Sequence, residues 1–424
     1  MITRRTLMKS GAAFAAAAAS GIAIPAYAQN KKLKIGYVSP QTGPLSAFSA
    51  ADAFMVEKFL AAAPGLGLDV EVVVKDSQSN PNRAAEVAKE LISRDEVNLL
   101  LVASTPETTN PVCSIAEQEE VPVISTVAPW QPWFIGQQGN PADPKSWQQF
   151  DYVYHFFWGL EDNVSVFMNM WNSVDTNKKV GALWPNDGDG NAWASDVGMP
   201  PVLAKAGYQL TDPGRYQNLT DDFSAQINAF KQAGCDIMTG IPIPPDFTTF
   251  WTQAKQQGFN PKLVSVAKAL LFPESVAALG ELGHNLTAEV WWSPSHPFKS
   301  SLTGESAADM AAAFEKAAKR QWTMPVGFVH ALFEVAADAI KRTEDPTDRE
   351  ALAQAVASTN LDTVVGKVQW GRDNVPEFAR KNVSKTPLVG GQWRRKEDGS
   401  FDLVIVENAN APEIPLGGKL ETLS

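Results

Sequence analysis

The side chains that most often carry catalysis are few in this sequence and stand far apart. The four histidines are separated by long stretches of chain: His155, His284, His296 and His330. There is no motif for a nucleophilic serine, a zinc-binding helix or a phosphate-binding loop. Asp187 and Asp189 offer the carboxylates that a divalent cation prefers, but an Asn-Asp-Gly cluster after a strand is more often a plain turn. We therefore expect no enzymatic activity, no cofactor and no metal.

Tryptophan is the residue type in excess, with thirteen copies against six tyrosines. Several tryptophans stand beside predicted turns rather than inside strands: Trp130, Trp133, Trp193, Trp251, Trp291 and Trp292. Core filling explains any single one of them at least as well as contact with a ligand. As a group beside strand ends, they favour a pocket for a planar or apolar small molecule.

The N-terminal segment has the parts of an export signal. Arg4 and Arg5 precede an alanine-rich apolar run, and an Ala-x-Ala cleavage site ends at Ala28. The run is broken by Gly21 and is too short to span a bilayer. We expect residues 1–28 to be a twin-arginine signal peptide, and the mature protein to work in the periplasm without membrane insertion.

Charge, length and cysteine content limit the class of protein further. A formal net charge of −11 disfavours nucleic acid or an anionic membrane as a partner. A chain of 424 residues is long enough for two domains, each with its own core. The two cysteines, Cys113 and Cys235, fall in segments that we assign to different lobes, so we expect buried free thiols and no disulfide.

Short apolar runs alternate with helical patterns along the chain. The predicted strands are residues 34–38, 69–75, 97–103, 121–125, 178–184, 235–240 and 263–266. Helices are expected between them, including one over 192–206, and residues 134–150 read as a long loop. This alternation predicts an α/β fold of two similar lobes, each a parallel sheet with helices on both faces.

Taken in order, several segments resemble the type I periplasmic solute-binding proteins of the branched-chain amino acid (Leu/Ile/Val-binding) ABC transporter family. They are KIGYVSPQTGPL at 34–45, DSQSNP at 76–81, VPVIS at 121–125, DFSAQI at 222–227, VGKV at 365–368 and GQW at 391–393. The resemblance implies two lobes joined by a three-strand hinge. Lobe one would comprise residues 29–155 plus 294–364, and lobe two residues 156–293 plus 365–424.

The resemblance also implies a function. Such a protein closes on a small organic ligand and delivers it to a membrane permease with separate ATPase subunits, and a monomer is the default state. The same fold would serve a periplasmic sensor that feeds a membrane receptor. An exported hydrolase is a third alternative, although the sequence offers no evident pair of nucleophile and base.

The family's ligand contacts fall on specific positions of this chain. In lobe one they are Phe48, Thr105, Thr108, Thr109, Thr126, Ala128 and Trp130. In lobe two they are Asp189, Trp193, Pro242 and Lys268, and the tryptophans beside strand ends add Trp292. Parallel sheets bind ligands beyond the carboxyl ends of their strands, which is where these residues are expected.

Lys268 is the main departure from the family pattern. It falls where amino-acid binders of this family have the acid that pairs with the ligand's ammonium group. A lysine in a dry site would repel an ammonium and attract a carboxylate. The expected ligand is therefore an aromatic or other organic carboxylate, or an amino-acid-like compound.

Overall fold

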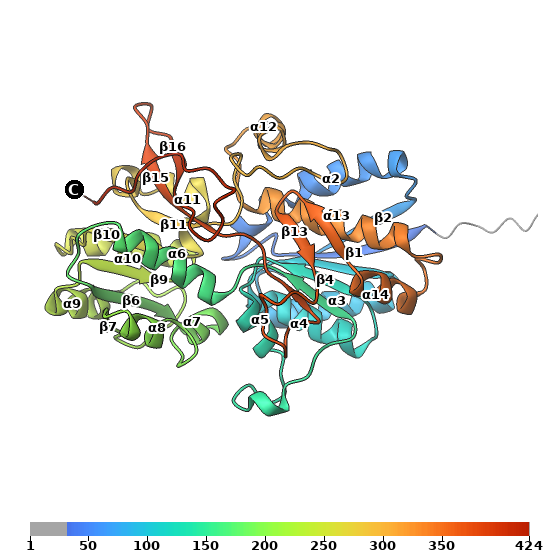
Figure 1. Ribbon diagram of the computed structural model, residues 1–424, viewed down its shortest axis with the longest axis horizontal. Coiled ribbons are helices and arrows are strands. Elements are labelled where there is room, and N and C mark those ends of the chain that lie inside the picture. The colour runs from blue at the N-terminus through green and yellow to red at the C-terminus, as the bar shows by residue number, and fades with distance from the viewer. Residues whose placement is uncertain (1–31, 424) are drawn as a thin grey trace, which may run out of the picture. The chain divides into compact units, whose positions relative to one another are not determined.

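The computed structural model describes residues 32–423, which contain two large sheets covered by helices and one separate two-stranded sheet (Figure 1). The predicted signal peptide, residues 1–28, lies outside the described residues. The α/β fold class predicted from the alternating pattern is confirmed. No helix of the described chain is long and apolar enough to cross a bilayer.

Lobe one is built on six strands in the order β14-β5-β4-β3-β1-β2, all parallel to their neighbours. Their bounds are β1 Leu33–Ser39, β2 Val70–Asp76, β3 Leu99–Ala103, β4 Val123–Thr126, β5 Val153–Phe156 and β14 Val383–Ser384. The helices are α2 Asp52–Ala62, α3 Pro81–Ser93, α4 Pro106–Gln118, α5 Trp130–Ile135, α12 Ala307–Ala318, α13 Pro325–Arg342 and α14 Arg349–Ala357. Every residue of β3 is buried, as expected for a strand with helices on both faces.

Lobe two is built on a second sheet in the order β16-β15-β11-β10-β9-β6-β7, with β8 paired to β6. Its strands are β6 Lys179–Pro185, β7 Gln209–Thr211, β8 Arg215–Tyr216, β9 Ile237–Gly240, β10 Leu263–Val266, β11 Thr287–Val290, β15 Val389–Arg395 and β16 Phe401–Glu407. Its helices are α6 Leu160–Asn172, α7 Gly188–Trp193, α8 Met199–Lys205, α9 Ser224–Ala233, α10 Pro244–Gln256 and α11 Pro273–Ala277. Only β15 and β16 run antiparallel to their neighbours.

The chain passes between the two sheets three times, after β5, after β11 and between β14 and β15. The first crossing follows Phe156, and the second follows Val290. The third falls after Ser384, about twenty residues later than the boundary at 364/365. The reason is that β12 (Asn360–Thr363) and β13 (Gly366–Gln369) form a separate hairpin, and β14 then pairs with β5 of lobe one.

One predicted helix is divided in two. Residues 192–206 were expected to form a single helix, whereas the structure has α7 and α8 with a break between them. The Asp187 side chain accepts the Gly190 N–H and so starts α7 early. Pro200 and Pro201 lack N–H groups, so they fit only the first turn of a new helix.

The two cysteines are buried and unpaired, as expected. Cys113 lies on α4 of lobe one, and Cys235 lies directly before β9 of lobe two. Burial raises the pKa of the Cys113 thiol to about 12, so this thiol stays protonated and unreactive.

Candidate ligand-binding site

A small cavity lies between the two lobes, with six lining residues from each. The lobe-one wall, as we call it, consists of Phe48, Thr105, Val127 and Pro129 together with Phe157 and Trp158. The last two directly follow β5, and their backbones hydrogen-bond to Ser384 and Trp130 of lobe one. The lobe-two wall consists of Asp189, Ile241, Lys268, Leu271, Glu289 and Trp291. The cavity measures about 20 Å³, which is room for about one water molecule.

Each wall is made from the segments that follow parallel strands. Phe48 follows β1, Thr105 follows β3, and Trp158 follows β5. In lobe two, Ile241 follows β9 and Lys268 follows β10. The carboxyl ends of parallel strands meet at one edge of a sheet, so residues far apart in the sequence converge here.

The lobe-one wall supplies shape and contains no ionisable side chain. The ring of Phe48 meets that of Phe272 from lobe two edge-on, with centroids 4.9 Å apart. Phe157 meets Trp291 in the same way, at 5.2 Å. Aromatic rings thus join the two walls, and pairs of this kind contribute about 0.5–1.5 kcal/mol each.

The lobe-two wall supplies charge. The Lys268 ammonium lies 2.5 Å from Asp189 Oδ2 and 3.7 Å from Asp187 Oδ2. Burial alone would lower the pKa of Lys268, but the two carboxylates raise it above its usual value. Burial raises the pKa of Asp189 to about 6, and raises that of Glu289 to about 8. At pH 7, therefore, Lys268 is charged and Glu289 is largely protonated.

The backbone at Lys268 forms a turn that few residues adopt. Its φ is 62° and its ψ is −57°, and the Ala269 N–H donates to the Ala267 carbonyl at 2.6 Å. These values describe a γ-turn of the strained type. Across the cavity, Val127 also has a positive φ, of 72°, which is unfavourable for a β-branched side chain. Each wall thus holds one strained residue, as is typical of ligand-binding sites.

Five buried polar atoms on the two walls have no hydrogen-bond partner. They are Thr105 Oγ1, Trp158 Nε1, Trp291 Nε1, Asp189 Oδ1 and Glu289 Oε2. A buried polar atom without a partner costs about 1–3 kcal/mol. Their concentration in one small space makes this cavity a candidate ligand-binding site.

The lobes also touch directly at the edge of this site. The Gly188 N–H, at the start of α7, donates to Glu107 Oε1 at 2.5 Å. Glu107 is in the first turn of α4, so this hydrogen bond joins a helix of each lobe. The described conformation is therefore one in which the two walls are closed on each other.

Comparison with known proteins agrees with this architecture. A family model described as periplasmic binding protein matches residues 32–377, most of the chain. The chain belongs to this family. The resemblance to periplasmic solute-binding proteins found in the sequence is thereby confirmed.

Three solved structures show the same fold. A leucine-binding protein from Thermotoga maritima has 19% identity and a TM-score of 0.71, covering 89% of this chain and 99% of its own. A branched-chain amino acid-binding protein from Streptococcus pneumoniae, in complex with isoleucine, has 18% identity and a TM-score of 0.66, covering 89% and 100%. An ABC transporter solute-binding protein from Rhodopseudomonas palustris, in complex with 3,4-dihydroxybenzoic acid, has 16% identity and a TM-score of 0.68, covering 90% and 98%.

Four of the twelve residues expected from the sequence line the cavity: Phe48, Thr105, Asp189 and Lys268. The other eight do not line it: Thr108, Thr109, Thr126, Ala128, Trp130, Trp193, Pro242 and Trp292. They come from the expected loops and helices but point elsewhere. Loop position alone therefore does not decide which side chains line the cavity.

The hydroxyl groups of the three other threonines are already used inside lobe one. Thr108 donates to Ser104 Oγ, Thr109 to the Ser104 carbonyl, and Thr126 to the Phe156 carbonyl. The carbonyl of Ala128 lies 2.7 Å from a ring nitrogen of His155.

The expected tryptophans and Pro242 are turned away as well. Trp130 donates to Glu161, Trp193 packs on Trp184, and Trp292 packs on Trp322. Pro242 is buried next to Ile241, which lines the cavity in its place.

Eight lining residues were not among the twelve expected contacts: Val127, Pro129, Phe157, Trp158, Ile241, Leu271, Glu289 and Trp291. Of these, Trp291 does belong to the group of tryptophans that the sequence associated with a pocket. Four of the eight, Val127, Pro129, Ile241 and Trp291, are sequence neighbours of residues that were expected. Side chains alternate in direction along a strand, so Glu289 and Trp291 share one side of β11 while Trp292 takes the other. This alternation was the available signal for choosing Trp291 over Trp292.

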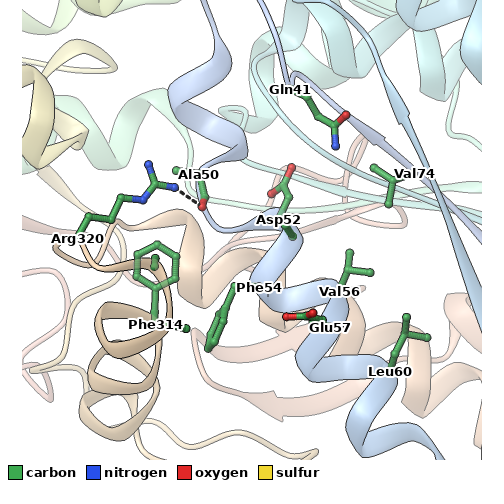
Figure 2. A pocket seen from close by; sticks show the side chains of 13 residues that line it. Gln41, Ala50, Asp52, Phe54, Val56, Glu57, Leu60, Val74, Phe314 and Arg320 are labelled. Carbon is green, nitrogen blue, oxygen red and sulfur yellow. Dashed lines mark hydrogen bonds between the residues drawn. The ribbon is translucent and has the colours of Figure 1, made fainter.

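A second, larger hollow of about 750 Å³ lies on lobe one beside α2 (Figure 2). All of its lining residues belong to lobe one, so it is not closed by the two lobes meeting. Phe54 and Phe314 form its apolar side, and Arg320 donates to the Ala50 carbonyl at 2.6 Å. Because only lobe one lines this hollow, a substitution in it can serve as a control for a substitution in the cavity between the lobes.

Proposed function

We propose that this protein is an extracytoplasmic receptor of an ABC importer, without enzymatic activity. It would bind a small organic ligand between its lobes and deliver it to a separate membrane permease. The observation that carries the proposal is the cavity itself, lined equally by the carboxyl ends of two parallel sheets and holding five unpaired polar atoms. Membership of the periplasmic binding protein family supports the same function.

The mechanism would be opening and closing of the lobes. A space of about 20 Å³ cannot admit an organic ligand, so the walls must part before one enters. The ligand then stabilises the closed form through contacts that exist only when both walls meet it. The Glu107–Gly188 hydrogen bond and the Phe48–Phe272 contact would form in that same step.

The ligand would have an apolar or aromatic body with polar groups. Four aromatic rings line the cavity, and its unpaired atoms include both donors and acceptors. Two structural relatives are bound to isoleucine and to 3,4-dihydroxybenzoic acid. Both compounds are small molecules with an apolar or aromatic body and polar groups, which supports a ligand of the same kind here. The predicted twin-arginine signal supports action in the periplasm, and a monomer remains the expected state.

A thermal-shift screen of residues 29–424 tests the proposal. The panel contains amino acids, aromatic carboxylates, amines and amides. A ligand at about one hundred times its dissociation constant adds about 2.7 kcal/mol of stability. Turnover of a bound compound into a product would instead favour the hydrolase alternative.

A matched pair of variants locates the binding. Val127→Trp fills the cavity and should abolish the shift, whereas Ala317→Trp places the same bulk in the hollow of Figure 2 and should leave it unchanged. A shift that survives in Val127→Trp would contradict binding between the lobes.

A further inference from the structure

The only positive charge on the walls of the cavity is already matched. Lys268 lies within ion-pair distance of two carboxylates, Asp189 and Asp187. The carboxylate of Glu107 also acts on this group from lobe one. One ammonium group is thus paired with two carboxylates, and a third carboxylate acts on it electrostatically, before any ligand enters. A ligand carboxylate would find no free cation here and would meet a surplus of negative charge.

Two of the three unpaired atoms on the lobe-two wall are carboxyl oxygens, and the third is the indole N–H of Trp291. Asp189 uses Oδ2 for Lys268 and leaves Oδ1 without a partner. Glu289 receives the Lys268 backbone N–H on Oε1 at 3.4 Å, and its Oε2 has no hydrogen-bond partner, although the buried side-chain amide of Asn163 also acts on this carboxyl group. Both side chains are almost completely buried, being 1% exposed, so neither acid is a solvated surface group. Asp189 Oδ1 can therefore accept a hydrogen bond from a ligand, and Glu289 Oε2 can do so once Glu289 has released its proton.

The remaining walls suit a positive charge on an apolar body. Phe48, Phe157, Trp158 and Trp291 contribute aromatic rings from both lobes. Aromatic faces attract ammonium groups, most strongly where water is excluded. The unpaired indole N–H groups of Trp158 and Trp291 and the Thr105 hydroxyl are neutral, and they can serve a carbonyl or hydroxyl oxygen.

The geometry points to a ligand with a protonated amine or amidine on an apolar or aromatic body and no net negative charge. Asp189 Oδ1 and Glu289 Oε2 accept its N–H groups, and Lys268 is an internal counter-ion that positions Asp189. This inference rests on the proposed receptor function and decides its ligand class. It replaces the carboxylate expected from the sequence, because that expectation treated Lys268 as unpaired.

Matched pairs of probes test the inference directly. Binding of benzylamine and benzoate, and of isoleucinamide and isoleucine, is measured by titration calorimetry on residues 29–424 at pH 7. Benzamidine and phenethylamine extend the amine set. The amine of each pair should bind about tenfold or more tightly than its partner.

Proton counting adds a readout that does not require a variant. Burial holds the pKa of Glu289 at about 8, so this side chain is mostly protonated before binding. A bound cation favours the carboxylate, so benzylamine should release up to about one proton at pH 7. The released protons are measured by repeating the titration in buffers of different ionisation enthalpy.

Three variants test which residues are responsible for amine binding and for the proton release. Asp189→Asn and Glu289→Gln should each weaken benzylamine by about tenfold or more, and Glu289→Gln should also lose the proton release. Asp246→Asn is the matched control. Asp246 is a buried acid of lobe two with an unpaired Oδ2, but it does not line the cavity.

The outcomes separate this inference from the receptor function. Tighter binding of benzoate, proton uptake on binding, or failure of every amine would overturn the inference. If carboxylates alone bind and Val127→Trp abolishes their binding, the receptor function stands and the inferred preference for amines is wrong. If no compound of either class binds, both proposals fail.

Discussion

Six residues of lobe one and six of lobe two face the same cavity, yet all three ionisable side chains on its walls come from lobe two. The lobe-one wall contributes aromatic rings, a proline, a valine and one hydroxyl group to the lining of the cavity. The lobe-two wall contributes Asp189, Lys268 and Glu289. The contrast suggests a division of tasks, in which one lobe selects shape and the other selects charge.

The largest effect should come from removing the only cation of the lobe-two wall. Lys268→Met leaves Asp189 and Asp187 without their partner in a buried place, and breaking such a pair costs about 3–5 kcal/mol. Burial places the pKa of folded Asp189 at about 6, above its unfolded value, so its ionisation opposes folding at higher pH. The loss, measured by urea unfolding, should therefore be smaller at pH 5 than at pH 7.

Lys262→Met is the control for this prediction. Lys262 pairs with Asp236 at 3.3 Å on the surface of the same lobe, and surface pairs contribute about 0–1 kcal/mol. Equal losses of unfolding free energy in Lys268→Met and Lys262→Met would mean that the buried ion pair contributes no more stability than a surface pair.

Glu289→Gln should show the next largest effect, through its dependence on pH. Folded Glu289 has a pKa of about 8 because it is buried, whereas its ordinary value is 4.5. Between these values the unfolded chain binds fewer protons, so the wild type loses up to about 1.4 kcal/mol of stability per pH unit as pH rises. The glutamine variant lacks this loss and should become the more stable protein toward pH 8. Parallel stability curves for the two proteins, followed by denaturant unfolding, would contradict the assignment.

Phe48→Leu should have a smaller effect that does not depend on pH. It keeps an apolar side chain but loses the aromatic contact with Phe272, so about 1 kcal/mol of stability is lost. The same loss is expected at pH 5 and pH 8, because no titratable group lines the lobe-one wall. A loss of stability that changed with pH would contradict the assignment of all ionisable side chains of the cavity to the lobe-two wall.

The smallest change in stability should follow Thr105→Val. The Thr105 hydroxyl has no partner, so its removal should alter stability by less than about 0.5 kcal/mol. Thr126→Val is the comparison, because that hydroxyl donates to the Phe156 carbonyl at 2.6 Å and its loss should cost about 1 kcal/mol. Thermal unfolding of the two variants, measured side by side, distinguishes a hydroxyl kept for a ligand from one that holds the fold.

The fold was largely predictable because local patterns and global architecture agree. β10 has the predicted bounds, Leu263–Val266, since a short apolar run there is bounded by turns. The two-residue strand β14 could not be foreseen, because no hydrophobic pattern exists at that length. It moved the third crossing between the lobes, and only its pairing with β5 reveals it.

The site was less predictable because side-chain direction depends on turns that the sequence does not announce. Val127 and Lys268 both adopt positive φ, and neither is a residue from which that would be expected. The partner of Lys268 was also hidden, since Asp187 and Asp189 lie about eighty residues earlier in the chain. Residue type indicated that a charge would be present, but only the fold shows that it is paired.

The most direct test of the central claim is a crystal structure of residues 29–424 with the compound that stabilises them most in the thermal-shift screen. The compound should lie between the two walls, with its polar contacts to Asp189 and Glu289 and its apolar body against Phe48 and Trp158. A compound seated in the hollow of Figure 2, or bound in the cavity through polar contacts to lobe one alone, would contradict the central claim.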